Sequence, residues 1–338
     1  MSLKNRYILK ELLKYFLIFI VAFSVFLFLT DIFSGILAYF RNHAQFPWRY
    51  YFTRLPHKVY VISPLITLLS ILFVFGEIEK SREIEIFEIK GLRPLHILNL
   101  FFIFGLCSAI FFFLLGNFFP ENLRTGGIKY VHLASRNFVF WAERYYPSGM
   151  FKNVVIITIQ KKHLRLYQMQ YAYPENNTFL LKNGEIRNLI NPSVSTKKFI
   201  SYNLNVSFDT KKFMDFILLN VKKSSFFNAL TVLKAMEKIG FFPKSKWIDL
   251  YEKIAYPLLN FFFVFIMLPL FYNRNVFSRF KIFILAIIIS ISAYSIYSIG
   301  IALGKNDIIN WAISPWLFHI ILLVTGIIYL LKKEMRYI

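Results

Sequence analysis

Six long apolar runs constrain this chain more than any other feature of its sequence. They cover roughly residues 15–39, 59–76, 97–119, 254–272, 282–303 and 313–331. A helix needs about 20 predominantly apolar residues to cross the hydrocarbon core of a bilayer, so each run predicts a membrane-spanning helix. The composition supports this prediction. Hydrophobic residues make up 57% of the chain and 41 of its 338 residues are Phe, which makes the chain more apolar than a typical soluble domain.

Four basic residues precede the first run, as in a secretory signal peptide: Lys4, Arg6, Lys10 and Lys14. The run is too long for the apolar region of a signal peptide, and it lacks a small-x-small cleavage site near its end. We therefore expect the first run to remain as the first spanning helix.

The distribution of Lys and Arg predicts the orientation of the spans. These residues gather at the N-terminus, at the C-terminus and in the loops 77–96 and 273–281, which places both termini in the cytoplasm. One loop fits poorly, because it should lie outside and yet carries four basic residues, Arg41, Arg49, Arg54 and Lys58. Two interpretations stay open: chance snorkelling at the interface, or contact with an anionic lipid headgroup, whose phosphate Arg can bind through two hydrogen bonds.

Residues 120–250 differ from the rest, because apolar residues there alternate with a period of two. Strands are predicted most clearly at 154–159, 164–171 and 202–208. The dipeptide Asn183-Gly184 between two short apolar runs predicts a hairpin turn. This pattern predicts an antiparallel sandwich or jelly roll between the third and fourth spans, outside the cytoplasm. A short amphipathic helix at 226–239 would lead back to the membrane.

Motifs for nucleotide binding and hydrolysis are absent. The segment from Gly300 to Asn306 resembles a phosphate-binding loop, but it is one residue short and has Asn where Ser or Thr must bind magnesium. The motifs HExxH and GxSxG do not occur. Cys107 is the single cysteine, which excludes a disulfide framework and a Cys-based metal site. We expect no enzymatic activity, no metal and no cofactor in this chain; any ATP would be used by another protein.

Two ionisable residues lie within the apolar runs, where burial in lipid is costly and function is the usual reason for it. Asp31 lies near the outer end of the first run and His319 lies inside the sixth. A hydrogen bond to a neighbouring helix would explain His319, and capping or snorkelling at the interface would explain Asp31. A membrane-embedded transferase would need more converging acid and base groups than these two.

The loop between the second and third runs predicts a short amphipathic helix with many acidic residues. Ile84, Ile86 and Phe87 form its apolar stripe, Ser81 is a candidate N-cap, and Gly91 suits the C-terminal cap. Anionic headgroups repel an acidic helix, so insertion into a groove of a soluble partner is favoured over a helix that only lies at the interface.

Several short motifs, in this order, resemble those of one family: Leu55-Pro56, Ser63-Pro64-Leu65, Gly76, Ser81-Arg82-Glu83, Gly91, 252–258, 268–270, Asn310-Trp311-Ala312 and Pro315. The family is that of the YjgP/YjgQ proteins, the LptF/LptG permeases that extract lipopolysaccharide from the inner membrane. The resemblance covers nearly the whole chain. It implies six transmembrane helices plus a periplasmic antiparallel β jelly-roll domain inserted between helices 3 and 4, in the bacterial inner membrane.

The resemblance also implies partners. They are a paralogous permease subunit, a dimeric cytoplasmic ATPase, a single-span periplasmic bridge protein of the LptC type, and lipopolysaccharide as the cargo. ATP would be used by the partner ATPase, and no nucleic acid is expected. The net charge of +22 suits either a basic proteome or an anionic partner such as this glycolipid.

The resemblance to the family also implies roles for individual residues. Glu83 would dock into the ATPase, with support from Glu85 and Gly91. Lysines in the outer part of the first helix meet the lipid phosphates in some family members, but Ser34 and Gly35 occupy that region here. Phosphate contact would then fall to Arg41 or Arg49, or to the partner permease.

These expectations divide the chain into residues 1–119, with three spans and a coupling helix at about 80–92; residues 120–250, the periplasmic domain; and residues 251–338, with three more spans. The rival hypothesis is a membrane-anchored periplasmic receptor or scaffold without transport activity. It predicts no lipid between the helices and no ATPase at the loop 77–96.

Overall fold

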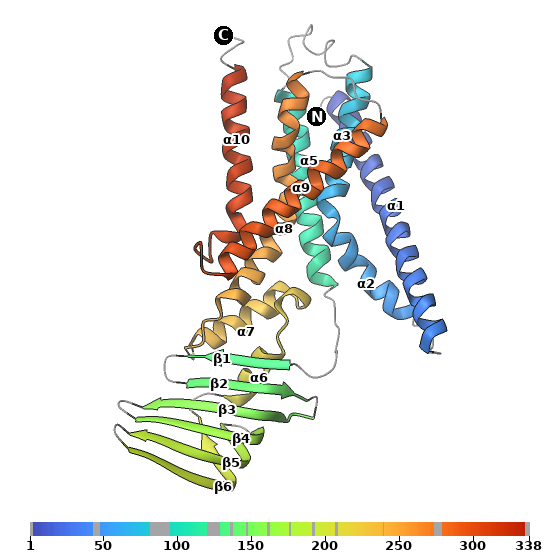
Figure 1. Cartoon of the computed structure of the whole chain (residues 1–338). Coiled ribbons are helices and arrows are strands. Elements are labelled where there is room, and N and C mark those ends of the chain that lie inside the picture. Colours follow the sequence, from blue (N-terminus) through green and yellow to red (C-terminus); the bar gives the residue numbers. More distant parts are fainter. Residues whose placement is uncertain are drawn as a thin grey trace. The chain divides into compact units, whose positions relative to one another are not determined.

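The computed structural model describes residues 3–42, 48–81, 95–119, 129–135, 138–146, 148–160, 163–175, 177–190, 193–206, 209–238, 240–273 and 279–334. The chain forms two compact units. One comprises Met1–Glu121 together with Ile248–Ile338, and the other comprises Asn122–Trp247. The first unit is helical and the second is built on a β-sheet (Figure 1).

The helical unit contains the long apolar segments. Its helices are α1 (Leu3–Asn42), α2 (Trp48–Val61), α3 (Ser63–Lys80), α5 (Leu95–Phe118), α8 (Lys244–Asn273, whose first turn belongs to the other unit), α9 (Arg279–Lys305) and α10 (Leu317–Glu334), the last preceded by the 3-10 turn η2 (Ser314–Trp316). Within the described residues, five helices are long and apolar enough to cross a membrane, and α2 with α3 would make a sixth span. The chain is therefore a multi-pass membrane protein, as the hydropathy pattern predicted.

The second predicted span is not one straight helix. α2 and α3 meet at a bend of 60°, and Ile62 between them has a ψ angle of 5°. Pro64 stands in the first turn of α3, where it has no N–H to donate to the preceding turn and its ring clashes with the carbonyl four residues earlier. The break leaves a carbonyl at Val61, which accepts a hydrogen bond from the hydroxyl of Tyr256 on α8. Such a break is tolerated in a membrane because a neighbouring helix satisfies the freed backbone group.

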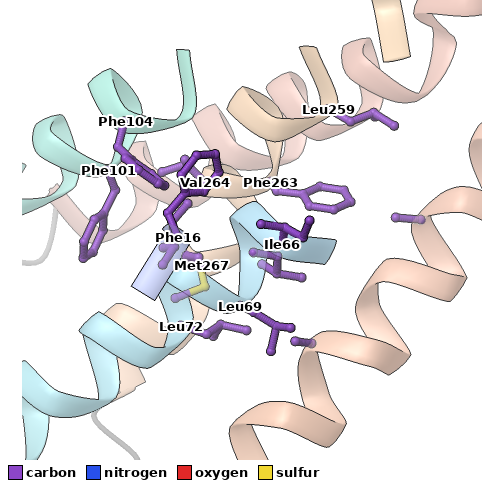
Figure 2. Close-up of a cluster of buried hydrophobic side chains, with 14 of the residues drawn as sticks. Phe16, Ile66, Leu69, Leu72, Phe101, Phe104, Leu259, Phe263, Val264 and Met267 are labelled. Atoms are coloured by element: carbon purple, nitrogen blue, oxygen red, sulfur yellow. The ribbon is translucent and has the colours of Figure 1, made fainter. Parts of the chain in front are cut away.

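The core of the helical unit lies among α1, α3, α5, α8 and α9. Figure 2 shows a cluster of its buried side chains and labels Phe16, Ile66, Leu69, Leu72, Phe101, Phe104, Leu259, Phe263, Val264 and Met267. In a bilayer this packing is held by van der Waals contact, because lipid is as apolar as the core, and close approach of the backbones is therefore important. Gly105 on α5 permits it, since a Cβ there would lie 3.0 Å from the backbone of both Asn260 and Phe261 on α8.

The second unit carries one antiparallel sheet. Its described strands are β1 (Lys129–Ala134), β2 (Phe138–Tyr145), β3 (Phe151–Gln160), β4 (His163–Glu175), β5 (Thr178–Ile190) and β6 (Ser193–Asn205). Each strand pairs with the next one in the chain (Figure 1). The predicted strands at 154–159 and 164–171 and the start of that at 202–208 lie in β3, β4 and β6. A jelly roll needs Greek-key connections, which the described strands do not show, so the predicted jelly roll is not confirmed.

The predicted hairpin at Asn183-Gly184 is wrong. β5 continues through both residues, since Lys182 pairs with Tyr171 and Gly184 pairs with Met169 on β4. Asn183 takes a positive φ of 53°, which Asn tolerates better than most residues. The local signal for a turn therefore produces a kink inside a long strand, because pairing with strands on both sides holds the chain extended.

Helix α6 (Thr210–Leu218) packs on one face of the sheet, where it contacts β4. The 3-10 turn η1 (Val221–Lys223) follows, and then α7 (Phe226–Lys238), which contacts α6 and confirms the helix predicted at 226–239. Phe213 of α6 is fully buried at the centre of this face, with its ring centroid 5.3 Å from that of Phe140 and 5.7 Å from that of Phe179. Lys246 closes the end of α6 by donating to the carbonyls of Phe216, at 2.7 Å, and Leu219, at 3.2 Å.

Candidate functional site

The predicted site residues lie where the structure leaves their side chains undescribed. Glu83, Glu85 and Gly91 belong to the segment 82–94, which is outside the described residues. Arg41 belongs to α1 and Arg49 to α2, but their side chains are outside the described set as well. The roles assigned to these five residues therefore stay predictions.

The helix that leads into the segment 82–94 is well defined. α3 ends at Lys80, and Ser81 closes it: its hydroxyl donates to the carbonyl of Ile78 at 3.0 Å, and its backbone N–H donates to that of Glu77 at 3.1 Å. Ser81 is thus the C-terminal cap of α3, whereas its predicted role as an N-cap concerns a helix outside the described residues. α3 contacts α1, α5 and α9 and is buried along most of its length, so the segment 82–94 follows directly on the central helix of the unit.

An ion pair joins the first two helices. Lys58 on α2 donates to the carboxylate of Asp31 on α1, and the Asp31 side chain is 15% exposed while that of Lys58 is 34% exposed. Pairing lowers the cost of holding each charge within a spanning helix. The sequence singled out both residues, but separately. Both residues lie at the outer ends of predicted spans, and this shared position could have predicted that they form an ion pair.

His319 has a structural role in the bundle. The residue is 2% exposed, and its Nε2 lies 2.8 Å from the carbonyl oxygen of Ala255 on α8. Its ring packs against Phe262, with centroids 4.9 Å apart, and against Trp316 at 5.7 Å. His319 therefore ties α10 to α8, which agrees with the hydrogen-bonded interpretation. Among the described residues, no group of three His, Cys, Asp or Glu side chains is placed to hold a metal ion.

A buried polar seam connects α3 to α8 beside the helix break. Tyr256 donates to the carbonyl of Val61, and the side-chain amide of Asn260 lies 3.5 Å from the hydroxyl of Ser63. Thr67 and Ser70 continue the polar stripe along α3, and both are fully buried. Sequence reasoning missed this seam, although the spacing of the three hydroxyl residues at positions 63, 67 and 70 follows one face of a helix.

Comparison with known proteins identifies the family of the chain. The family model described as "Lipopolysaccharide export system permease LptF/LptG" matches residues 6–125 and 128–333. No match was found among the curated proteins. The family match takes in both compact units and nearly every residue between the two ends. The chain therefore belongs to the LptF/LptG family of lipopolysaccharide export permeases.

Proposed function

We propose that this chain is the permease subunit of an ABC-type transporter that extracts lipopolysaccharide from the inner membrane and passes it to a periplasmic bridge. A separate ATPase supplies the energy. The observation that carries the proposal is the family match across both units, taken with a spanning bundle that provides the membrane part. The proposed partners are a paralogous permease, a dimeric cytoplasmic ATPase and a single-span bridge protein of the LptC type.

Coupling to the ATPase is assigned to the segment after α3, with Glu83 as the docking residue and Glu85 and Gly91 in support. The continuity of this segment with α3 favours the assignment. A displacement imposed at the C-terminal end of α3 acts on a helix packed against α1 and α9, and these contacts offer a direct path into the bundle.

Contact with the phosphates of the lipid is assigned to Arg41 and Arg49. Both lie in the two helices that the Asp31–Lys58 ion pair joins. Lys58 pairs with Asp31, which makes Lys58 a weaker candidate for a lipid anion. Arg binds phosphate through two parallel hydrogen bonds, which favours it over Lys for this task.

The rival function, a receptor or scaffold without transport activity, is tested by the same experiment. The protein is extracted in mild detergent and the bound material is analysed for a Walker-motif ATPase and for lipopolysaccharide. Both should be recovered with the full chain; recovery of neither favours the receptor and refutes transport.

The coupling residue has its own test. Reversal of charge in Glu83→Lys should abolish recovery of the ATPase and lipopolysaccharide release. Glu237→Lys makes the same change at an exposed position of α7 and should leave both unchanged. Normal ATPase recovery and release by Glu83→Lys would remove the coupling assignment.

A further inference from the structure

The polar seam between α3 and α8 contains two buried oxygen atoms whose hydrogen bonding is incomplete. Within the described part of the chain, Oγ1 of Thr67 and Oδ1 of Asn260 have no hydrogen-bond partner. Both residues are fully buried. Buried polar atoms in folded proteins almost always have a partner, either in the protein or in an ordered water molecule. These two atoms therefore point to a ligand in the seam.

Thr67 differs from three other hydroxyl residues of the spanning helices. A hydroxyl within a helix can bond to a carbonyl of the preceding turn of the same helix. Ser70, Ser108 and Thr325 do so, at 2.7 Å, 2.9 Å and 2.8 Å. Among the described residues, Thr67 makes no such bond. Its hydroxyl is therefore turned away from the backbone of α3 and is available to a ligand.

Thr67 and Asn260 lie close enough for one small molecule to bridge them. The amide Nδ2 of Asn260 lies 3.5 Å from Oγ of Ser63, which places the amide beside Ser63. Ser63 and Thr67 are one helical turn apart on the same face of α3, so their Cβ atoms lie about 5–6 Å apart. Side chains in a helix lean towards its N-terminus, which brings the hydroxyl of Thr67 towards the amide. Such a separation is too long for a direct hydrogen bond and suits one bridging water.

Water matches these groups better than a cation does. The hydroxyls of Ser63 and Thr67 donate and accept, whereas Oδ1 of Asn260 only accepts, and a water molecule can bond to both kinds of group at once. A buried water typically makes about three hydrogen bonds to such groups, and these three side chains can supply them. Sodium would bring an uncompensated charge into a spanning helix, at high cost, because none of the three side chains is acidic.

We propose that the seam binds a water molecule between α3 and α8, held by Ser63, Thr67 and Asn260. The site lies just after the break between α2 and α3, where Tyr256 bonds to the carbonyl of Val61. A bridging water is nearly as favourable as a direct hydrogen bond, so it ties α3 to α8 where the two side chains do not meet. The site is independent of the cargo and of the ATPase, because it is formed within the helical unit.

Radiolytic labelling of the full chain in detergent tests for the water directly. X-rays split water into hydroxyl radicals, and a buried side chain is oxidised where a water molecule is bound beside it. Phe263 and Val264 lie one turn from Asn260 and are only 1% and 0% exposed, so bulk water does not reach them. In water enriched with heavy oxygen, at least one of the two should gain the heavy isotope. Phe140 in the core of the sheet is equally buried and should stay unlabelled; absence of label from both Phe263 and Val264 would overturn the proposal.

The sign of one substitution gives a second test. Thr67→Val replaces the hydroxyl by a methyl group of similar size. Loss of a hydroxyl that lacks any partner should raise the melting temperature, because an unsatisfied buried group is costly. Loss of one that binds water should lower it, by about 2–4 °C for one hydrogen bond in a unit of this size. Thr325→Val removes an exposed hydroxyl that bonds within its own helix and should have a much smaller effect; a higher or unchanged melting temperature in Thr67→Val would overturn the proposal.

Two comparisons identify the ligand. Asn260→Leu should also lower the melting temperature, and the loss in Thr67→Val/Asn260→Leu should be smaller than the two single losses together, because both remove the same water. Fully additive losses would contradict a shared ligand. The unchanged protein should melt at one temperature in sodium, potassium and choline chloride of equal ionic strength, and a rise specific to sodium or potassium would overturn the water in favour of a cation. Recovery of the ATPase and of lipopolysaccharide is measured separately, so failure of the water site and failure of the proposed function remain distinguishable.

Discussion

The side chain of Phe213 is the most informative place to perturb the β-sheet unit. It is fully buried, and its ring centroid lies between 5.3 and 6.4 Å from those of four other rings: Phe138, Phe140, Phe179 and Phe241. Replacement of a buried Phe by Ala costs about 3–5 kcal/mol, because it loses the transfer free energy of the ring and leaves a cavity. Domains are stable by only about 5–15 kcal/mol, so Phe213→Ala should remove a large part of the stability of this unit.

This loss of stability can be measured by hydrogen exchange. Each 1.4 kcal/mol is a factor of ten in an equilibrium constant, so opening of the sheet should become about a hundredfold to several thousandfold more frequent. Amide exchange followed by mass spectrometry on the full chain in detergent reports such opening locally, without unfolding of the helical unit. Peptides from β2 and β5, whose Phe rings lie against Phe213, and from β4, which contacts α6, should lose protection. Peptides from α3 and α5 should exchange at their original rates.

Phe227 supplies the matched control. It lies on α7 in the same unit but is 67% exposed, so Phe227→Ala should change stability by less than about 0.5 kcal/mol. Phe213→Leu keeps much of the apolar volume and should fall between the two. Unchanged exchange of β2, β4 and β5 in Phe213→Ala would refute the view that α6 anchors the core of the sheet.

Two predictions concern the helical unit. Asp31→Asn leaves the ammonium of Lys58 without its carboxylate and should destabilise the bundle by about 1–3 kcal/mol, seen as a lower melting temperature in detergent. Asp31→Asn/Lys58→Gln should recover part of the loss, and a double variant no more stable than the single one would contradict the ion pair. Gly105→Val should cost about 1–3 kcal/mol by overpacking against the backbone of α8; Leu106→Val, at a side chain 45% exposed, is its control, and equal melting temperatures would exclude the close approach.

Local patterns in the sequence predicted the helices and strands better than they predicted the turns and the order of strands in the sheet. Periodicity found the helix at Phe226–Lys238 and strands within β3, β4 and β6, because the alternation of apolar residues records which face is buried. The same local reasoning failed at Asn183-Gly184, where cross-strand pairing overrides a turn signal. The jelly roll stays a prediction, because the order of strands in a sheet depends on contacts that no single strand encodes.

In the candidate site too, the sequence identified individual residues, whereas the structure was needed to identify their partners. Asp31, Lys58 and His319 were all singled out from the sequence, since a charged or polar side chain in an apolar run is visible without a structure. That Asp31 meets Lys58, and that His319 meets the carbonyl of Ala255, required the packing of helices distant in the chain. The break beside Pro64 was visible as a proline, but the hydroxyl of Tyr256 that satisfies it was not.

The sequence by itself determined that this is a membrane protein with a separate strand-rich segment. Hydropathy and periodicity reveal both features, because each depends only on residues that are neighbours in the chain. Only the tertiary structure decided that Asn153 of β3 and Asn183 of β5, both with positive φ angles, fall in one row of the sheet. Register between strands sets such a row, and register is fixed by pairing across the whole sheet rather than by any local run of residues.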